Sequence, residues 1–212
     1  MTRSSMTQAE HAAIADAVRS AERGTSGEIY CVLARASDDY FFPAAFAVSV
    51  AIVLISMVLA LALDTGWYTL APFTFVAAQA LAIASALLLL WLVPSLRILL
   101  VPRRLQYRRA HDNALRQFLA RNVHITSART GVLLFVSLAE RYAEVVADAG
   151  INSRVDQKTW DGVVATLLAG ARRGAVATGF VAAVGEVGAL LAAHFPPRSQ
   201  DANELDDHVV EI

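Results

Sequence analysis

Two long runs without a charged residue constrain the fold of this chain more than any other feature. Residues 40–63 contain no charged side chain, and a second uncharged run extends over residues 65–96. About twenty apolar residues in a helix span the roughly 30 Å hydrocarbon core of a bilayer. Residues 44–63 form one candidate span, and residues 73–93, ended by Pro94, form the second. The pattern predicts a two-helix transmembrane hairpin over residues 39–103.

The residues around the two runs predict an orientation. The turn at residues 64–69 has no positive charge and carries Trp67 and Tyr68, a pair typical of a membrane interface. Five arginines follow the second run: Arg97, Arg103, Arg104, Arg108 and Arg109. By the positive-inside rule they stay cytoplasmic, so we expect a multi-pass inner-membrane protein with both termini in the cytoplasm. The same arginines can contact anionic lipid headgroups.

The composition lies between that of a soluble domain and that of an all-membrane protein. The chain has 212 residues, of which 56% are hydrophobic and 17% charged, and its mean hydropathy is +0.48. This leaves room for one domain of roughly 130–150 residues beside the hairpin. A net charge of −1 gives no field that favours nucleic acid, and no stacking platform accompanies the arginines, so nucleic acid is not an expected partner. The single cysteine, Cys31, excludes an internal disulfide and is expected in the core.

The segments on either side of the hairpin are each too small to form a domain alone, but together they contain the elements of one domain. In residues 1–38, Thr7 and Glu10 form a capping box for a helix that ends near Gly24, and Glu28–Ala34 reads as a strand. Residues 105–122 suggest a helix. Its candidate apolar face consists of Leu105, Ala110, Leu115, Phe118 and Leu119. One helix and one strand cannot bury a core alone, so residues 1–38 and 104–198 are expected to form one domain.

The second segment continues with a β-hairpin and two helices. Residues 131–151 hold two β-branched runs joined at residues 139–141, where Glu140 and Arg141 are interpreted as a solvated turn, with partner recognition as the alternative. Asp156 can cap a helix whose apolar residues are Trp160, Val163, Val164, Leu167 and Leu168. Residues 175–194 suggest a final helix buried against the sheet, because Glu186 interrupts it; a third membrane span is the alternative. The acidic tail, residues 199–212, is expected to be mobile or loosely docked. The predicted fold class is α/β, a small sheet flanked by helices and interrupted by the transmembrane hairpin.

Several sequence stretches resemble the TPM domain family. They are "ARTGVLLFVSLAERYAEVVADAGI", "DQKTWDGVV" and "LLAAHFP" followed by "NELDD". The resemblance is strongest over residues 130–164, and residues 25–33 are similar to the family's first strand. It implies a compact α/β sandwich that is often tethered to a membrane. A hairpin inserted after the first strand departs from members that are anchored at a terminus.

The family is also labelled a phosphatase domain, a label that the residues must support. Ser37 stands where a C-x5-R loop beginning at Cys31 would need arginine, and there is no Asp-x-Asp turn or phosphate-binding glycine loop. The five histidines show no metal-ligand spacing. Three carboxylates at strand and helix ends remain: Glu28, Asp148 and Asp156. They form the candidate metal site, for Ca²⁺ or Mg²⁺, and a metal held there could polarise a phosphoryl group. The alternative is structural: a strand end, a turn former and a helix cap.

Two classes of function follow. The first is a membrane-tethered interaction or accessory module for the assembly, repair or regulation of membrane complexes, with the bilayer and a membrane protein as partners. The second is a divalent-metal-assisted phosphatase of broad specificity. The absence of a nucleophile motif favours the first class.

Overall fold

The computed structural model describes residues 6–65, 71–126, 129–197, 205 and 207–212. The chain divides into two compact units. The first contains residues 1–37 and 107–212, and the second contains residues 38–106. The predicted interfacial pair, Trp67 and Tyr68, lies outside the described residues.

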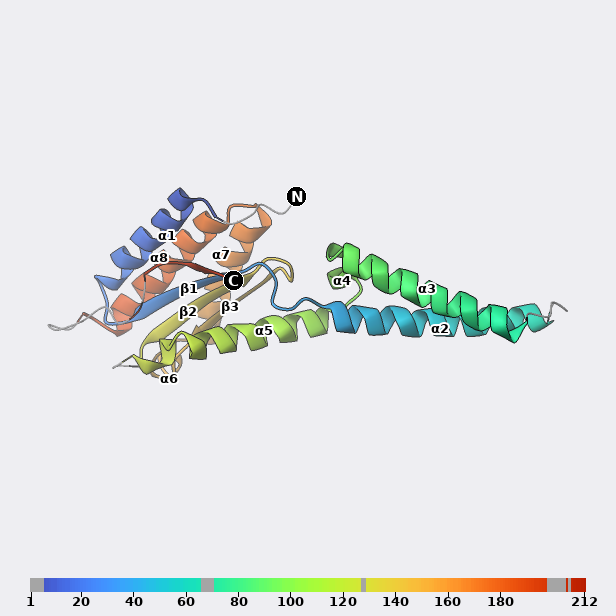
Figure 1. Ribbon diagram of the computed structural model, residues 1–212. Helices are drawn as coiled ribbons and strands as arrows, with labels where there is room; N and C mark the ends of the chain where they lie inside the picture. The colour runs from blue at the N-terminus through green and yellow to red at the C-terminus, as the bar shows by residue number, and fades with distance from the viewer. Residues whose placement is uncertain (1–5, 66–70, 127–128, 198–204, 206) are drawn as a thin grey trace. The chain divides into compact units, whose positions relative to one another are not determined.

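The first unit is built on a four-stranded sheet of order β3-β2-β1-β4 (Figure 1). Strand β1 (Glu28–Ala34) pairs in parallel with β2 (Gly131–Ser137), and β2 pairs in antiparallel fashion with β3 (Tyr142–Ala147). Every residue of β1 and β2 is buried, as expected for β-branched and aliphatic strands at the centre of a sheet. The first strand of the predicted hairpin, β2, and its partner strand β1 therefore form the middle of one sheet, although residues 39–103 separate them in the sequence.

Three helices cover one face of this sheet (Figure 1): α1 (Gln8–Glu22), α7 (Gln157–Arg172) and α8 (Val176–His194). The predicted capping box is present, since the Thr7 hydroxyl accepts a hydrogen bond from the Glu10 amide and the Glu10 carboxylate accepts one from the Thr7 amide. A short helix, α6 (Ala149–Asn152), links β3 to α7. The main core lies between these helices and the odd-numbered residues of β1. Helix α8 packs as the predicted core helix, and its Glu186 is exposed and accepts a hydrogen bond from Thr166.

On the opposite face, helix α5 (Arg103–Ala120) and the 3-10 helix η1 (Val123–Ile125) cover the smaller core. The predicted apolar face of α5 was wrong in part. Ala110, Ala114 and Phe118 are buried, whereas Leu115 and Leu119 are 38% and 57% exposed. The buried stripe recurs every four residues through two small alanines that allow the helix to approach the sheet closely.

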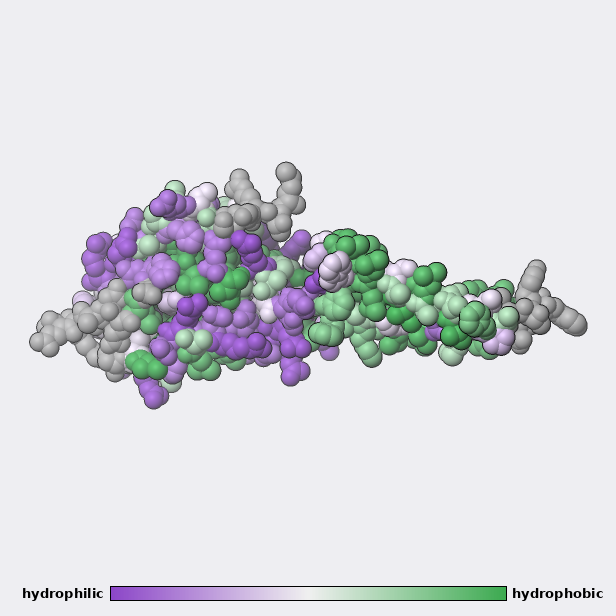
Figure 2. All heavy atoms as spheres, in the orientation of Figure 1, coloured by the Kyte–Doolittle hydropathy of each residue, from purple (hydrophilic) through white to green (hydrophobic). Residues whose placement is uncertain are grey.

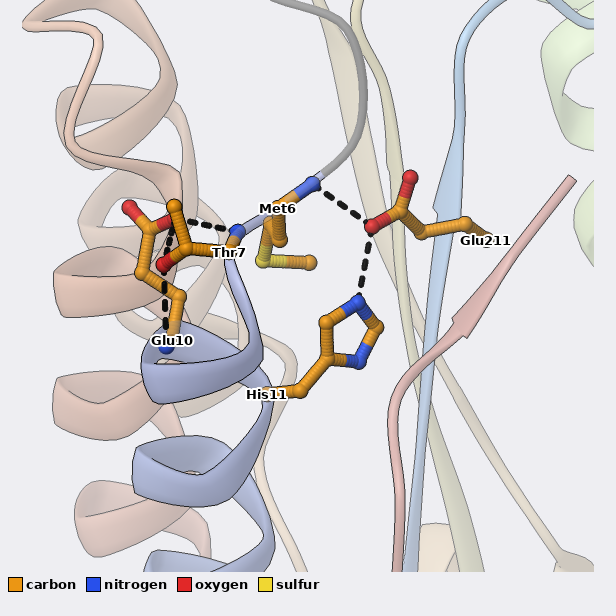
Figure 3. A network of polar contacts seen from close by, with 5 residues as sticks. All are labelled: Met6, Thr7, Glu10, His11 and Glu211. Carbon is orange, nitrogen blue, oxygen red and sulfur yellow. Dashed lines mark hydrogen bonds and ion pairs between the residues drawn. The ribbon is translucent and has the colours of Figure 1, made fainter.

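Residues 210–211 form a fourth strand, which corrects the prediction of a mobile or loosely docked tail for the end of the chain, while residues 199–204 and 206 lie outside the described residues. Strand β4 (Val210–Glu211) pairs in parallel with the outer edge of β1, and the Ile212 amide donates to the Leu33 carbonyl at 3.0 Å. Figure 3 shows the Glu211 carboxylate accepting from the Met6 amide at 2.7 Å and contacting His11 Nε2 at 2.8 Å. Val209, just before β4, is 2% exposed and packs into the main core. The tail thus protects an edge strand that would otherwise be unpaired.

The second unit contains the two uncharged segments as helices α2 (Phe41–Thr65) and α3 (Pro72–Leu92), followed by the short α4 (Ser95–Leu99). Hydrophobic residues cover its surface along α2 and α3 (Figure 2). The side chain of Arg97, in α4, contacts the last turn of α3. Its Nε donates a hydrogen bond to the Leu90 carbonyl at 2.8 Å, and its guanidinium lies 5.3 Å from the centre of the Phe41 ring. Among the described residues three helices, α2, α3 and α8, are long and apolar enough to cross a membrane. These properties are compatible with insertion of the hairpin.

Candidate functional site

Two connecting segments build the edge of the sheet at which β1 and β2 begin. The Thr130 hydroxyl donates to the Ser26 carbonyl at 2.8 Å, and the Thr130 amide donates to the Thr126 hydroxyl at 3.0 Å. The Thr25 hydroxyl donates to the Phe195 carbonyl at 2.7 Å, so the end of helix α8 is fixed to the same edge. These threonines are buried. These hydrogen bonds fix the backbone at this edge of the sheet, so side chains there are held in defined positions.

Two of the predicted site residues lie at this edge, on either side of Gly131. Glu28 pairs with Gly131 in the β1–β2 ladder, and the Asp148 amide donates to the Gly131 carbonyl at 2.9 Å. Both carboxylates are 8% exposed. A side chain at position 131 would place its Cβ 2.0 Å from the Val123 carbonyl oxygen, so glycine is required there.

The Asp148 carboxylate is satisfied on one oxygen. Asp148 Oδ1 accepts a hydrogen bond from the Ala149 amide at 2.6 Å and so caps helix α6. Asp148 Oδ2 is buried and accepts no hydrogen bond from any residue that the structure describes. A buried carboxylate oxygen without a donor is costly, because it has lost its hydration, and a cation or a water molecule would relieve that cost.

The third predicted residue, Asp156, lies on a different element. It is the N-cap of α7, is exposed, and makes no side-chain capping hydrogen bond. Within the described part of the chain, no group of three or more histidine, cysteine, aspartate or glutamate residues could hold a metal ion. The structure thus brings Glu28 and Asp148 to one edge, and the complete trio with Ca²⁺ or Mg²⁺ stays a prediction.

Glu22 adds a carboxyl group that the sequence did not single out. It lies at the end of α1 and accepts a hydrogen bond from the Ile29 amide at 2.8 Å. Burial is the main cause that raises the pKa of Glu22 to about 8, and the charges of Glu28 and Asp207 raise it further, while the Ile29 amide lowers it. Glu22 is therefore mostly protonated at neutral pH. In the sequence it is one of three acids in a surface helix, with Glu10 and Asp16, so no pattern marks it.

Glu140 occupies the opposite edge, where β1 and β2 end, and its predicted role as a solvated turn residue was wrong. Its side chain is fully buried, with Oε1 accepting from the Ser37 amide at 2.8 Å and Oε2 accepting from the Ser137 hydroxyl. The Ser37 and Ser137 hydroxyls are 3.0 Å apart. Arg141 beside it is exposed and has a positive φ of 53°, so the turn directs the glutamate inward and the arginine outward. Glu140, Ser37 and Ser137 hold the chain in place where β1 ends. Because the Glu140 carboxylate is buried, a substrate could not reach it.

Cys31 and Ser137 do not fit the nucleophile of a covalent phosphatase mechanism. Cys31 lies in the main core, as predicted, and burial raises the pKa of its thiol. A thiolate is needed for attack on phosphorus, and this environment disfavours it. Ser137 is fully buried and engaged with Glu140.

Comparisons with known proteins agree with this fold. Residues 94–190 match the family model of the TPM domain. The structure is similar to the NMR structure of BA42 protein from the psychrophilic bacterium Bizionia argentinensis, with a TM-score of 0.61 and 20% sequence identity over 100% of this chain and 98% of that chain. At this identity the likeness concerns the fold alone. Among curated proteins no sequence matches significantly. The resemblance inferred from the sequence is confirmed over residues 94–190, which match the TPM domain, and strand β1 lies before the matched residues.

Proposed function

We propose that this chain is a membrane-tethered TPM-domain protein that serves as an interaction or accessory module in the assembly, repair or regulation of a membrane complex. The observation that carries the proposal is the contrast between its two units. Helices α2 and α3 expose large apolar side chains along their length, including Leu54, Leu61 and Trp91. The first unit, in contrast, is a packed domain in which the Cys31 thiol and the Ser137 hydroxyl are buried.

In the proposed topology α2 and α3 form a hairpin in the inner membrane, and both termini are cytoplasmic. The arginines after α3 and their absence at residues 64–69 support this orientation. Single cysteines at Gln8 and Ala193, both exposed, are expected to be protected from an impermeant thiol reagent added to intact cells. A cysteine at Ala71 is expected to react. Reaction at position 193 from outside would contradict the two-span topology, because it would make α8 a third span.

The accessory role requires a membrane-protein partner. Crosslinking in intact membranes followed by affinity capture of the full chain tests this role. We expect one membrane complex to be recovered reproducibly, and recovery to fall when the surface of the first unit is altered while the hairpin is intact. Recovery that depends on α2 and α3 alone would contradict an interaction role for the TPM domain.

A divalent-metal-assisted phosphatase is the second candidate, and Asp148 supports it. Its buried Oδ2 accepts no hydrogen bond from a described residue, and Asp148 lies at the same edge of the sheet as Glu28, on the other side of Gly131. If Ca²⁺ or Mg²⁺ binds there, metal at 100 times its dissociation constant adds about 2.7 kcal/mol to the stability of the full chain. Asp148→Asn should abolish that shift, and Asp156→Asn tests whether the third carboxylate takes part. Metal-dependent hydrolysis of a phosphate ester that is lost in Asp148→Asn would favour the enzyme. Binding without hydrolysis would leave the accessory role.

A further inference from the structure

Most of the exposed large apolar side chains of the first unit lie in one stretch of the chain. In the described part of that unit they are Tyr107, Leu115, Leu119, Ile125 and Ile212. All except Ile212 belong to α5 and η1, and Ile125 is the most exposed of them at 64%. Soluble domains seldom concentrate such side chains on one element without a use for them.

Helical geometry places Leu115 and Leu119 on a different side of α5 from the residues that face the sheet. Arg108, Leu115 and Leu119 recur at spacings of seven and four residues, which keeps them on one side of a helix. Ala110, Ala114 and Phe118 face the sheet and are buried. This side of α5 therefore has no covering element within the described first unit.

Exposed arginines lie in the same stretch of the chain as these apolar side chains. We define the outer α5 surface as Arg108, Leu115, Arg116, Leu119, Arg121 and Ile125, all exposed. Asp112, the one acidic residue within residues 108–125, is partly buried. Leucine and isoleucine interspersed with arginine is the pattern of a helix that lies in the interface of an anionic membrane.

The chain itself keeps this surface near a bilayer if the hairpin is inserted. Only residues 93–102 separate the end of α3 from the start of α5. A tether this short gives the surface a high effective concentration at the membrane, so that a weak individual affinity is sufficient.

We propose that the outer α5 surface docks on a lipid surface that carries anionic headgroups. Leu115, Leu119 and Ile125 enter the boundary between headgroups and acyl chains, and Arg108, Arg116 and Arg121 contact lipid phosphates. This inference rests on the membrane insertion in the proposed function. Because α1, α7 and α8 cover the opposite face of the sheet, docking would turn those helices toward the cytoplasm and leave them accessible to a protein partner.

The test uses the full chain with Leu119→Cys, labelled with a polarity-sensitive fluorophore and reconstituted into phosphatidylcholine vesicles with or without phosphatidylglycerol. Cys31 is buried and stays unlabelled in the folded chain. We expect a blue shift in emission only with phosphatidylglycerol, and its loss at high salt. A label at Lys158→Cys on α7 should show no shift.

Substitution of Arg108, Arg116 and Arg121 by glutamine should abolish the shift. Substitution of three exposed arginines elsewhere, Arg23, Arg172 and Arg173, should preserve it at the same net charge. Loss of the shift at high salt, measured on the chain with all arginines intact, tests the same electrostatic contact and does not depend on how the triple variant folds.

The outcomes separate the inference from the function on which it rests. A chain that floats with the vesicles but shows no shift at position 119 would overturn surface docking and leave the tether in place. Failure to float would overturn membrane insertion itself. A shift that is equal in neutral vesicles, or that requires added membrane proteins, would reject anionic lipid as the occupant.

Discussion

Helices α8 and α2 have similar chemistry and opposite surroundings. Both are long and apolar enough to span a bilayer, as is α3. Yet 44% of the most apolar window of α8 is buried inside the protein, compared with 0% for α2 and 6% for α3. An apolar composition requires a helix to leave water, but it does not decide whether protein or lipid replaces the water.

Small residues account for the difference. A Cβ at Gly170 of α7 would lie 2.6 Å from the Gly179 Cα of α8, and a Cβ at Gly188 would lie 2.6 Å from the Ala21 Cβ of α1. These close approaches let α8 pack between α1 and α7 and bury Val184 and Val187 completely. Helices α2 and α3 instead present large side chains outward, and such a surface suits lipid tails.

The largest difference between α8 and α2 is expected when the same negative charge is placed in each helix. Val184→Asp puts a carboxylate at a fully buried position of α8 and is expected to cost more than about 4 kcal/mol, enough to unfold the first unit. Leu54→Asp lies on the exposed side of α2 and should leave that unit folded while opposing membrane insertion by about 3 kcal/mol. Thermal unfolding and vesicle flotation measure the two effects separately. Loss of flotation in Val184→Asp with a normal melting temperature would show that α8 also lies in lipid.

Close packing of α8 is tested by a matched pair of glycines. Gly170→Ala should destabilise the first unit by about 1–3 kcal/mol, because the clash involves backbone that cannot move aside. Gly185→Ala in α8 meets no atom within 4 Å and should stabilise it by up to about 1 kcal/mol through helix propensity. Thermal midpoints of the full chain in one detergent give both values. Equal effects at the two positions would mean that the α7–α8 contact is not tight.

Local patterns predicted most of the fold. The capping box at Thr7, the strand Glu28–Ala34 and the hairpin hinge at Glu140 are set by neighbours in the sequence, and the structure has each of them. The errors came from long-range contacts. Glu140 is directed inward by a hydrogen bond from the Ser37 amide, about a hundred positions away, and Leu119 is exposed because Ala114 and Phe118 form the side of α5 that packs on the sheet.

The candidate site was predictable to a similar degree. Glu28 and Asp148 lie beside Gly131 because strand ends meet at a shared edge, which the order of elements suggested. Glu22 was missed because its environment comes from β1 and the C-terminal residues, neither adjacent to it in the sequence. Docking of the tail depended on a free edge of β1, which only the assembled sheet reveals.

A pH titration provides the mildest test, because it acts on the packed unit without changing its apolar surface. Glu22 holds its proton to about pH 8 in the folded chain, compared with 4.5 for the ordinary side chain. The folded state therefore binds more protons than the unfolded state between these values, and the stability from this group is full below the lower value and lost as pH rises through the upper one. Allowing for solvent screening, we expect a loss on the order of 1–2 kcal/mol.

Glu22→Gln should remove most of that slope, because the amide stays uncharged at every pH and its oxygen can still accept from the Ile29 amide. Glu186→Gln on the exposed side of α8 is the control and should keep the slope. Thermal midpoints of the first unit measured from about pH 5 to about pH 9 give the comparison, while the helicity of α2 and α3 should be constant throughout. An unchanged slope in Glu22→Gln would assign the pH dependence to other groups, and an equal loss of helicity in the hairpin would mean that the two units do not respond separately.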